Sequence, residues 1–244
     1  MEVILTNKIL VFIFDGMTDY EITFITHLLS TSAHKEIITV AYEDKIIKGC
    51  SGFLFKPSRL ISDVLYEDVE ALIIPGGWYG ETKLELIELI NNLNSKGKLI
   101  SGICGAGTIF LAKAGILNNV KYTTPAIEWT KKHIDVFGEK DPFPRENFVS
   151  ERVVRDGNII TAKGIAFIDF AIEICDWFNL FESNEEKRDF SKNIVPAPHM
   201  PLINFPFAFK LLINSINSSL VSPYHPPGII KPSISLSSSR YLTS

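Results

Sequence analysis

Short apolar runs alternate with amphipathic segments along most of the chain. Runs of this kind are typical of parallel strands covered on both faces of a sheet, and they occupy residues 8–14, 36–42, 71–74 and 98–103. The segments with apolar positions at helical spacing are residues 20–29, 81–94, 104–115 and 167–181. Strands that alternate with helices predict an α/β fold with a mainly parallel sheet.

Weaker patterns predict the elements between these runs. Residues 45–55 alternate as a hairpin would, and Asp156-Gly157 gives a type I′ turn signal between residues 148–154 and 158–162. We also expect a short capped turn near residues 62–63 and a short strand over residues 120–124. The polar, Pro- and Gly-containing segment 131–147 is expected to be a surface loop.

The junction at Cys104 is the sharpest feature of the pattern. An apolar strand ends there and a helical pattern begins at once, with no loop between them. Such a nucleophile elbow places one side chain above the sheet, at the positive end of the helix. The small residues Gly102, Gly105 and Ala106 suit so tight a turn. We expect the helix N-terminus to lower the thiol pKa, although a free cysteine can equally be a small buried hydrophobe.

Composition changes after Asp189. Residues 190–244 contain no Asp or Glu, hold 8 of the 13 prolines and end in a serine-rich run. Proline excludes regular helix and central strand, so we expect residues 189–244 to form an irregular tail, disordered or loosely packed. A partner-binding or membrane-surface role for its apolar part, residues 200–220, is the alternative.

Bulk properties exclude several classes of protein. The net charge of −4 and pI near 5.8 argue against a nucleic-acid binder. Three widely spaced cysteines form neither a disulfide framework nor a zinc motif. The start of the chain is too short and polar for a signal peptide, and no apolar stretch is long enough for a membrane span. We therefore expect a cytoplasmic protein with no metal or cofactor.

Three motifs in this order resemble the ThiJ/PfpI superfamily, which includes the parkinsonism-associated deglycase and has the class I glutamine amidotransferase-like fold. They are Gly16-x-x-x-x-Glu21, Pro75-Gly76-Gly77 and Ile103-Cys104-Gly105, and residues 153–164 are similar to the same superfamily. The resemblance implies a flavodoxin-like three-layer sandwich over residues 7–188 and a homodimer.

The resemblance also assigns roles to four residues. Cys104 matches the reactive cysteine, and Glu21 matches the acid beside it, which would stabilise a thiolate by donating a hydrogen bond to sulfur. The backbone N–H groups of Gly77 and Gly105 match an oxyanion hole. Without the resemblance, Glu21 would be interpreted as an exposed glutamate favoured by the helix dipole.

One expected residue is missing. Many members of the superfamily carry a histidine straight after the Thr-Thr pair, where this chain has Pro125 after Thr123-Thr124. His133 lies further on and is expected to be a surface histidine, with movement into the site as the alternative. Without a base, amidase, protease and glutaminase activities are less well supported.

The other candidates have supporting roles. Thr108 is expected to support the helix, Cys175 to lie in the core, and Cys50 to be partly exposed near a dimer contact. Three aromatic residues could form a pocket wall or could equally belong to the core: Trp78, Tyr79 and Trp129.

Three functions remain. The first is a hydrolase- or lyase-like enzyme, of glyoxalase, deglycase or amidase type, acting on a small carbonyl compound. The second is a non-enzymatic redox or stress sensor that works through oxidation of Cys104. The third is a pseudoenzyme that binds a partner through the tail.

Overall fold

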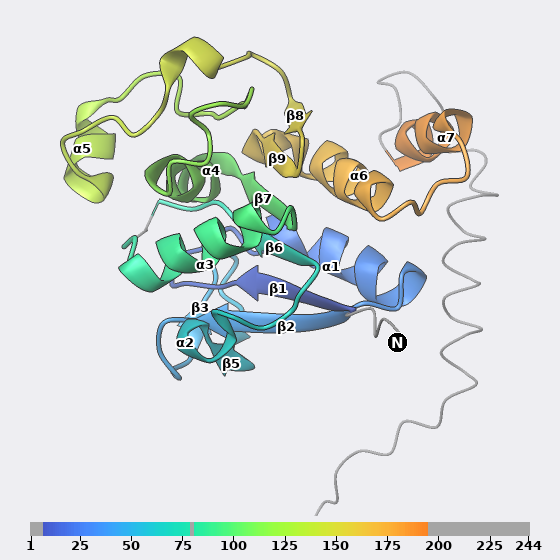
Figure 1. Ribbon diagram of the computed structural model, residues 1–244, viewed down its shortest axis with the longest axis horizontal. Helices are drawn as coiled ribbons and strands as arrows, with labels where there is room; N and C mark the ends of the chain where they lie inside the picture. The colour runs from blue at the N-terminus through green and yellow to red at the C-terminus, as the bar shows by residue number, and fades with distance from the viewer. Residues whose placement is uncertain (1–6, 79–80, 195–244) are drawn as a thin grey trace, which may run out of the picture.

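A seven-stranded sheet forms the middle layer of the computed structural model, which describes residues 7–78 and 81–194 (Figure 1). The strands are β1 (Lys8–Phe12), β2 (Glu36–Ala41), β5 (Arg59–Leu60), β6 (Ala71–Ile74), β7 (Leu99–Ile103), β8 (Val153–Asp156) and β9 (Ile159–Ala162). Their order is β5-β2-β1-β6-β7-β9-β8, and every neighbouring pair is parallel except β8 and β9. The predicted mainly parallel sheet is confirmed.

Helices cover both faces of this sheet. The two that pack together on one face are α1 (Tyr20–Ser32) and α6 (Phe167–Trp177), and those on the other face are α2 (Ile61–Val64), α3 (Leu84–Ser95) and α4 (Cys104–Lys113). This division follows from right-handed crossovers, because the chain runs from β1 to β2 in one direction and from β6 to β7 in the other. The three layers confirm the predicted flavodoxin-like sandwich.

The core explains the continuous apolar runs. The side chains of β6 and almost all those of β1 are fully buried, as are Leu99 and Ile100 of β7. A central parallel strand has helices above and below, so neither set of alternating side chains meets water.

Several local predictions need correction. Residues 120–124 contribute a single bridge, Tyr122 to Phe148, instead of a strand. The segment expected to be a surface loop contains α5 (Lys131–Phe137) and a 3-10 turn (Arg145–Asn147). The β8–β9 turn has positive φ at Gly157 alone (58°), whereas type I′ requires it at both loop residues. The expected hairpin at 45–55 is present as β3 (Ile47–Lys48) and β4 (Leu54–Phe55).

The boundary placed at residue 189 falls inside a helix. Helix α7 spans Asn184–Ile194 and packs against α6, and its Phe190 is buried beside Phe181, with ring centroids 5.5 Å apart. The compositional change at residue 189 therefore lies within α7. The rest of the predicted tail, residues 195–244, lies outside the described residues. Among the residues that are described, no helix is long and apolar enough to cross a membrane.

Candidate active site

The strand-to-helix junction forms as predicted. Strand β7 ends at Ile103 and α4 begins at Cys104, whose φ of 62° is unusual for a residue with a side chain. Gly107 permits this geometry, because a Cβ there would lie 2.6 Å from the carbonyl oxygen of Ile74. At Gly102 a Cβ would lie 2.7 Å from the carbonyl oxygen of Gly107. The small residues are thus required where the helix passes over the ends of β6 and β7.

Glu21 lies beside the sulfur of Cys104. It is in the first turn of α1 but only 1% exposed, so the interpretation as a solvated helix-start glutamate is wrong. Its Oε2 accepts a hydrogen bond from the Gly76 N–H at 2.7 Å. The carboxyl group also interacts with the Cys104 side chain, and its buried Oε1 has no hydrogen-bond partner among the described residues. Two residues 83 positions apart in sequence therefore form one buried pair.

The backbone donors expected to form an oxyanion hole point at the same sulfur. The N–H groups of Gly77 and Gly105 both donate to Cys104 Sγ. Gly77 has φ of 150°, and a Cβ there would lie 2.9 Å from the carbonyl oxygen of Gly16. Two N–H dipoles and the start of α4 thus place partial positive charge where negative charge on sulfur would develop.

Two further glycines enclose the pair, and sequence reasoning assigned them no role in the site. A Cβ on Gly76 would lie 2.3 Å from Cys104 Cβ and 2.7 Å from Glu21 Oε2. A Cβ on Gly164 would lie 2.7 Å from Glu21 Oε1 and 2.9 Å from Cys104 Sγ. Both glycines belong to motifs of the sequence, Gly76 to Pro75-Gly76-Gly77 and Gly164 to residues 153–164. Only the fold shows that they lie against Cys104 and Glu21.

The electrostatics of the pair differ from the expectation of a lowered thiol pKa. Burial, followed by the negative charge of Glu21, raises the pKa of Cys104 to about 12, and this outweighs the N–H groups of Gly105 and Gly77. Burial likewise raises the pKa of Glu21 to about 7, against the opposing hydrogen bond from Gly76. Because the two groups interact, these values belong to the pair. Between about pH 7 and pH 12 the pair holds one proton and one negative charge.

The other two cysteines lie in different settings. Cys175 is 2% exposed on α6, as expected of a core residue. Cys50 is exposed in the β3–β4 hairpin, with its sulfur 3.7 Å from Asp19 Oδ1.

No described histidine is a hydrogen-bond partner of Cys104. At the position of the expected base, Pro125 follows Thr124, whose Oγ1 lies 2.8 Å from Thr108 Oγ1. Thr108 also donates to the carbonyl oxygen of Cys104, which supports the first turn of α4. Among the described residues, no group of three or more His, Cys, Asp or Glu side chains could hold a metal ion.

His133 is buried in an aromatic stack, which corrects its assignment as a surface residue. Its ring lies 5.4 Å from that of Trp78 and 5.1 Å from that of Trp129. Nδ1 accepts a hydrogen bond from the Thr130 N–H, so the ring caps α5. Burial, with smaller effects from Arg145 and Lys132, lowers the pKa of His133. Tyr79 lies outside the described residues.

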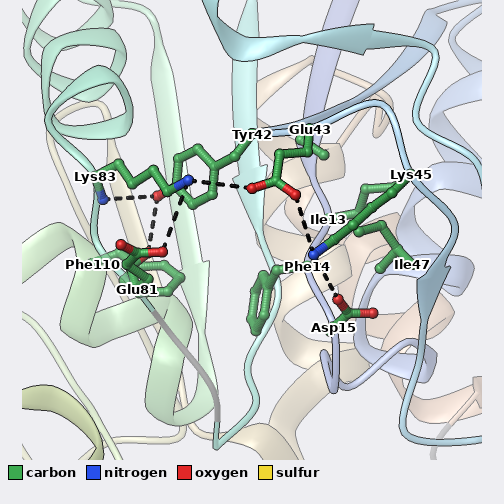
Figure 2. Close-up of a pocket in the computed structure, with 11 residues that line it drawn as sticks. Ile13, Phe14, Asp15, Tyr42, Glu43, Lys45, Ile47, Glu81, Lys83 and Phe110 are labelled. Carbon is green, nitrogen blue, oxygen red and sulfur yellow. Dashed lines mark hydrogen bonds and ion pairs between the residues drawn. The ribbon is translucent and has the colours of Figure 1, made fainter.

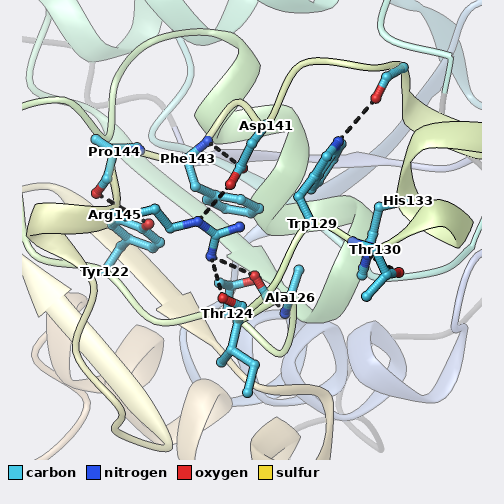
Figure 3. A network of polar contacts seen from close by, with 12 residues as sticks. Tyr122, Thr124, Ala126, Trp129, Thr130, His133, Asp141, Phe143, Pro144 and Arg145 are labelled. Atoms are coloured by element: carbon cyan, nitrogen blue, oxygen red, sulfur yellow. Dashed lines mark hydrogen bonds and ion pairs between the residues drawn. The ribbon is translucent and has the colours of Figure 1, made fainter.

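Arg145 fixes the segment that carries this stack (Figure 3). Its Nε donates to Asp141 Oδ2 at 2.8 Å, and Nη1 donates to the carbonyl oxygens of Ala126 and Ile127 at 2.7 and 3.1 Å. These bonds tie the chain before α5 to the chain after it. The region is therefore built around a half-buried cation, a feature that the hydropathy pattern does not reveal.

Sequence comparison places these features in a family. A model of the DJ-1/PfpI family matches residues 7–176. "Uncharacterized protease YoaZ" of Bacillus subtilis is 25% identical over 226 residues, covering 87% of this chain and 99% of the relative. "Deglycase PfpI" of Pyrococcus furiosus is 26% identical over 158 residues, covering 59% and 89%.

Solved structures share the fold. The DJ-1 superfamily protein Atu0886 from Agrobacterium tumefaciens superimposes with a TM-score of 0.65 at 25% identity, over 80% of this chain and 100% of that one. The ThiJ/PfpI family protein from Bacillus anthracis gives 0.64 at 24% identity, over 89% and 99%.

Proposed function

This chain belongs to the DJ-1/PfpI family, and we propose that it is a cysteine-dependent enzyme acting on a small carbonyl compound, in the manner of a deglycase or glyoxalase. The observation that supports this most is the set of contacts on one sulfur. Cys104 Sγ meets the N–H groups of Gly77 and Gly105 and the carboxyl group of Glu21. Relatives named as deglycases match 61% of this chain or slightly less.

The buried pair supplies the charge and proton that addition to an aldehyde requires. Transfer of the single proton from the Cys104 thiol to the Glu21 carboxylate places the negative charge on sulfur, where two N–H donors stabilise it. Sulfur then bonds to the carbonyl carbon, and the carbonyl π electrons move onto oxygen. That oxygen takes the proton of Glu21, which leaves a neutral hemithioacetal and a carboxylate. The carboxylate can serve as the base for the following step, so a histidine is not required.

The same contacts also support a second candidate, a redox sensor. Oxidation of the Cys104 thiolate by a peroxide gives a sulfenate and then a sulfinate, each step transferring one peroxide oxygen to sulfur. The N–H groups of Gly77 and Gly105 could donate to those oxygens, and Glu21 in its protonated form could do the same.

Turnover of methylglyoxal tests the enzymatic proposal. We expect the parent protein to consume this dicarbonyl and Cys104→Ser to abolish consumption, because a hydroxyl is a far weaker nucleophile. Cys50→Ser is the matched control, since it removes an exposed thiol outside the pair. No turnover with methylglyoxal or other small aldehydes, together with peroxide oxidation at Cys104 that weakens in Glu21→Gln, would favour the sensor instead.

We also propose that the protein is a homodimer. Phe53 and Leu54 in the β3–β4 hairpin are 66% and 68% exposed, and Tyr20 at the start of α1 is 46% exposed. Exposed apolar side chains gathered on neighbouring elements are typical of contact surfaces. Sedimentation equilibrium should give twice the chain mass of 27.4 kDa, and Leu54→Lys should shift the distribution towards the monomer.

A further inference from the structure

Two buried threonine hydroxyls connect the Cys104 junction to the chain that follows α4. Thr108 and Thr124 are both 0% exposed, and their Oγ1 atoms lie 2.8 Å apart. Thr108 Oγ1 also lies 2.5 Å from the carbonyl oxygen of Cys104 and 3.1 Å from that of Gly105. Thr124 Oγ1 accepts a hydrogen bond from the Ala126 N–H at 3.2 Å. A chain of hydrogen bonds thus runs from Ala126 to the backbone of Cys104.

These contacts fix the direction of each hydrogen bond in the chain. A carbonyl oxygen can only accept, so the single hydrogen of the Thr108 hydroxyl points to the carbonyl oxygens of Cys104 and Gly105. The contact between the two hydroxyls must then use the hydrogen of Thr124, because the hydrogen of Thr108 already forms the bond to the carbonyl group. Each hydroxyl therefore donates towards Cys104 and accepts from the side of Ala126.

The Cys104 carbonyl group at the end of this chain belongs to the same peptide group as the Gly105 N–H. That N–H donates to Cys104 Sγ. A peptide group whose oxygen accepts a hydrogen bond becomes a stronger donor through its N–H, since hydrogen bonds in series polarise one another. The Thr108 hydroxyl thus acts on the sulfur through the Gly105 N–H, which contacts the sulfur directly.

Other contacts hold both ends of the chain in place. Arg145 Nη1 donates to the carbonyl oxygen of Ala126 at 2.7 Å, as Figure 3 shows. At the other end, Phe110 lies two residues after Thr108 and therefore on the opposite side of α4. Phe110 is 0% exposed and packs edge-on against Phe14, with ring centroids 5.6 Å apart (Figure 2). Removal of one hydroxyl should therefore change the polarisation of the chain without moving the helix.

We propose that Thr108 is a positioning residue for the reaction of Cys104, because its hydroxyl makes the Gly105 N–H a stronger donor to the negatively charged sulfur. The inference rests on the proposed role of Cys104 as the nucleophile. It gives the Thr108 hydroxyl an effect on thiolate reactivity, beyond its contribution to the first turn of α4. Thr124 contributes to this effect through the hydrogen bond that it donates to Thr108.

Two substitutions at Thr108 separate this effect from packing. Thr108→Val keeps the shape of the side chain and removes the hydroxyl, whereas Thr108→Ser keeps the hydroxyl and removes the methyl group. The rate constant for alkylation of Cys104 by iodoacetamide is measured by mass spectrometry of the Cys104 peptide at pH 8, where the buried pair holds one proton. We expect Thr108→Val to react about two- to fivefold more slowly than the parent protein, and Thr108→Ser to react at the parent rate.

Thr31→Val is the matched control. Thr31 Oγ1 donates to the carbonyl oxygen of His27 at 2.7 Å, which is the same bond to the fourth residue back along a helix, but in the last turn of α1. This variant should leave the alkylation rate of Cys104 unchanged. Thr124→Val should slow alkylation in the same direction as Thr108→Val, and Thr124→Ser should not, so the second hydroxyl carries the test if Thr108→Val does not fold.

Iodoacetamide reacts with a thiolate whether or not the protein consumes methylglyoxal, so this result is separate from the fate of the enzymatic proposal. Alkylation at the parent rate in the valine variants of Thr108 and Thr124, with their folds verified by near-UV circular dichroism, would overturn the inference. Equal slowing in Thr108→Val and Thr108→Ser would also overturn it, since the effect would then come from packing. The same holds for equal slowing in Thr31→Val.

Discussion

Replacing Glu21 by Gln should remove a pH dependence of stability that is built into the buried pair. The pKa of Glu21 rises from its ordinary value of 4.5 to about 7 in the folded protein. The folded state therefore binds more protons than the unfolded state between these values. Its stability is highest below pH 4.5, falls as the pH rises towards 7, and is constant above that until the thiol titrates.

The magnitude follows from the shift. A change of one pKa unit corresponds to about 1.4 kcal/mol, so the shift of Glu21 costs roughly 3 kcal/mol of unfolding free energy between pH 4.5 and pH 7.5. Glutamine has the same shape and can still accept from the Gly76 N–H and donate to sulfur, but it does not titrate. The stability of Glu21→Gln relative to the parent should rise by that amount across the window.

Urea denaturation at pH 4.5, 6 and 7.5 measures the effect. Other titrating groups cancel when the variant is compared with the parent at each pH. Glu128→Gln is the matched control, since Glu128 is exposed and outside the site. A difference between Glu21→Gln and the parent that stays constant across the three pH values would refute the assignment of a raised pKa to this carboxyl group.

Three further substitutions test the packing around the site and the packing of α7 against the rest of the structure. Gly164→Ala should slow alkylation of Cys104 by iodoacetamide at least roughly tenfold, because its Cβ would lie 2.9 Å from the sulfur; an unchanged rate would mean that Gly164 does not constrain the pair. Gly107→Ala should destabilise the protein by about 1–3 kcal/mol in urea denaturation, since its Cβ would lie 2.6 Å from the carbonyl oxygen of Ile74, and a neutral result would contradict the close approach of α4 to β6. Phe190→Ala should lower the free energy of unfolding by about 3–5 kcal/mol if α7 is an integral part of the fold, because the Phe190 side chain is 5% exposed. A decrease below about 1 kcal/mol would show that α7 contributes little to stability.

The hydropathy pattern was sufficient to predict the three-layer α/β architecture. Continuous apolar runs arise where helices cover both faces of a strand, and that condition can be recognised from sequence alone. The junction at Cys104 was likewise predictable, because a strand pattern and a helical pattern meet there without an intervening loop. The pattern did not predict α7, because this helix is polar apart from Phe190 and Ile194 and a single buried aromatic residue gives too weak a signal.

The pKa values and the burial of the side chains in and near the site were decided by the tertiary structure. From its helix-start position Cys104 was expected to have a lowered pKa, but the fold buries it beside Glu21 and raises the pKa to about 12. In the same way, His133 was expected at the surface, yet the fold stacks it between Trp78 and Trp129. The local sequence determines which side chain lies at the strand-to-helix junction. Desolvation and charge pairing depend on groups that are distant in the chain, and only folding brings those together.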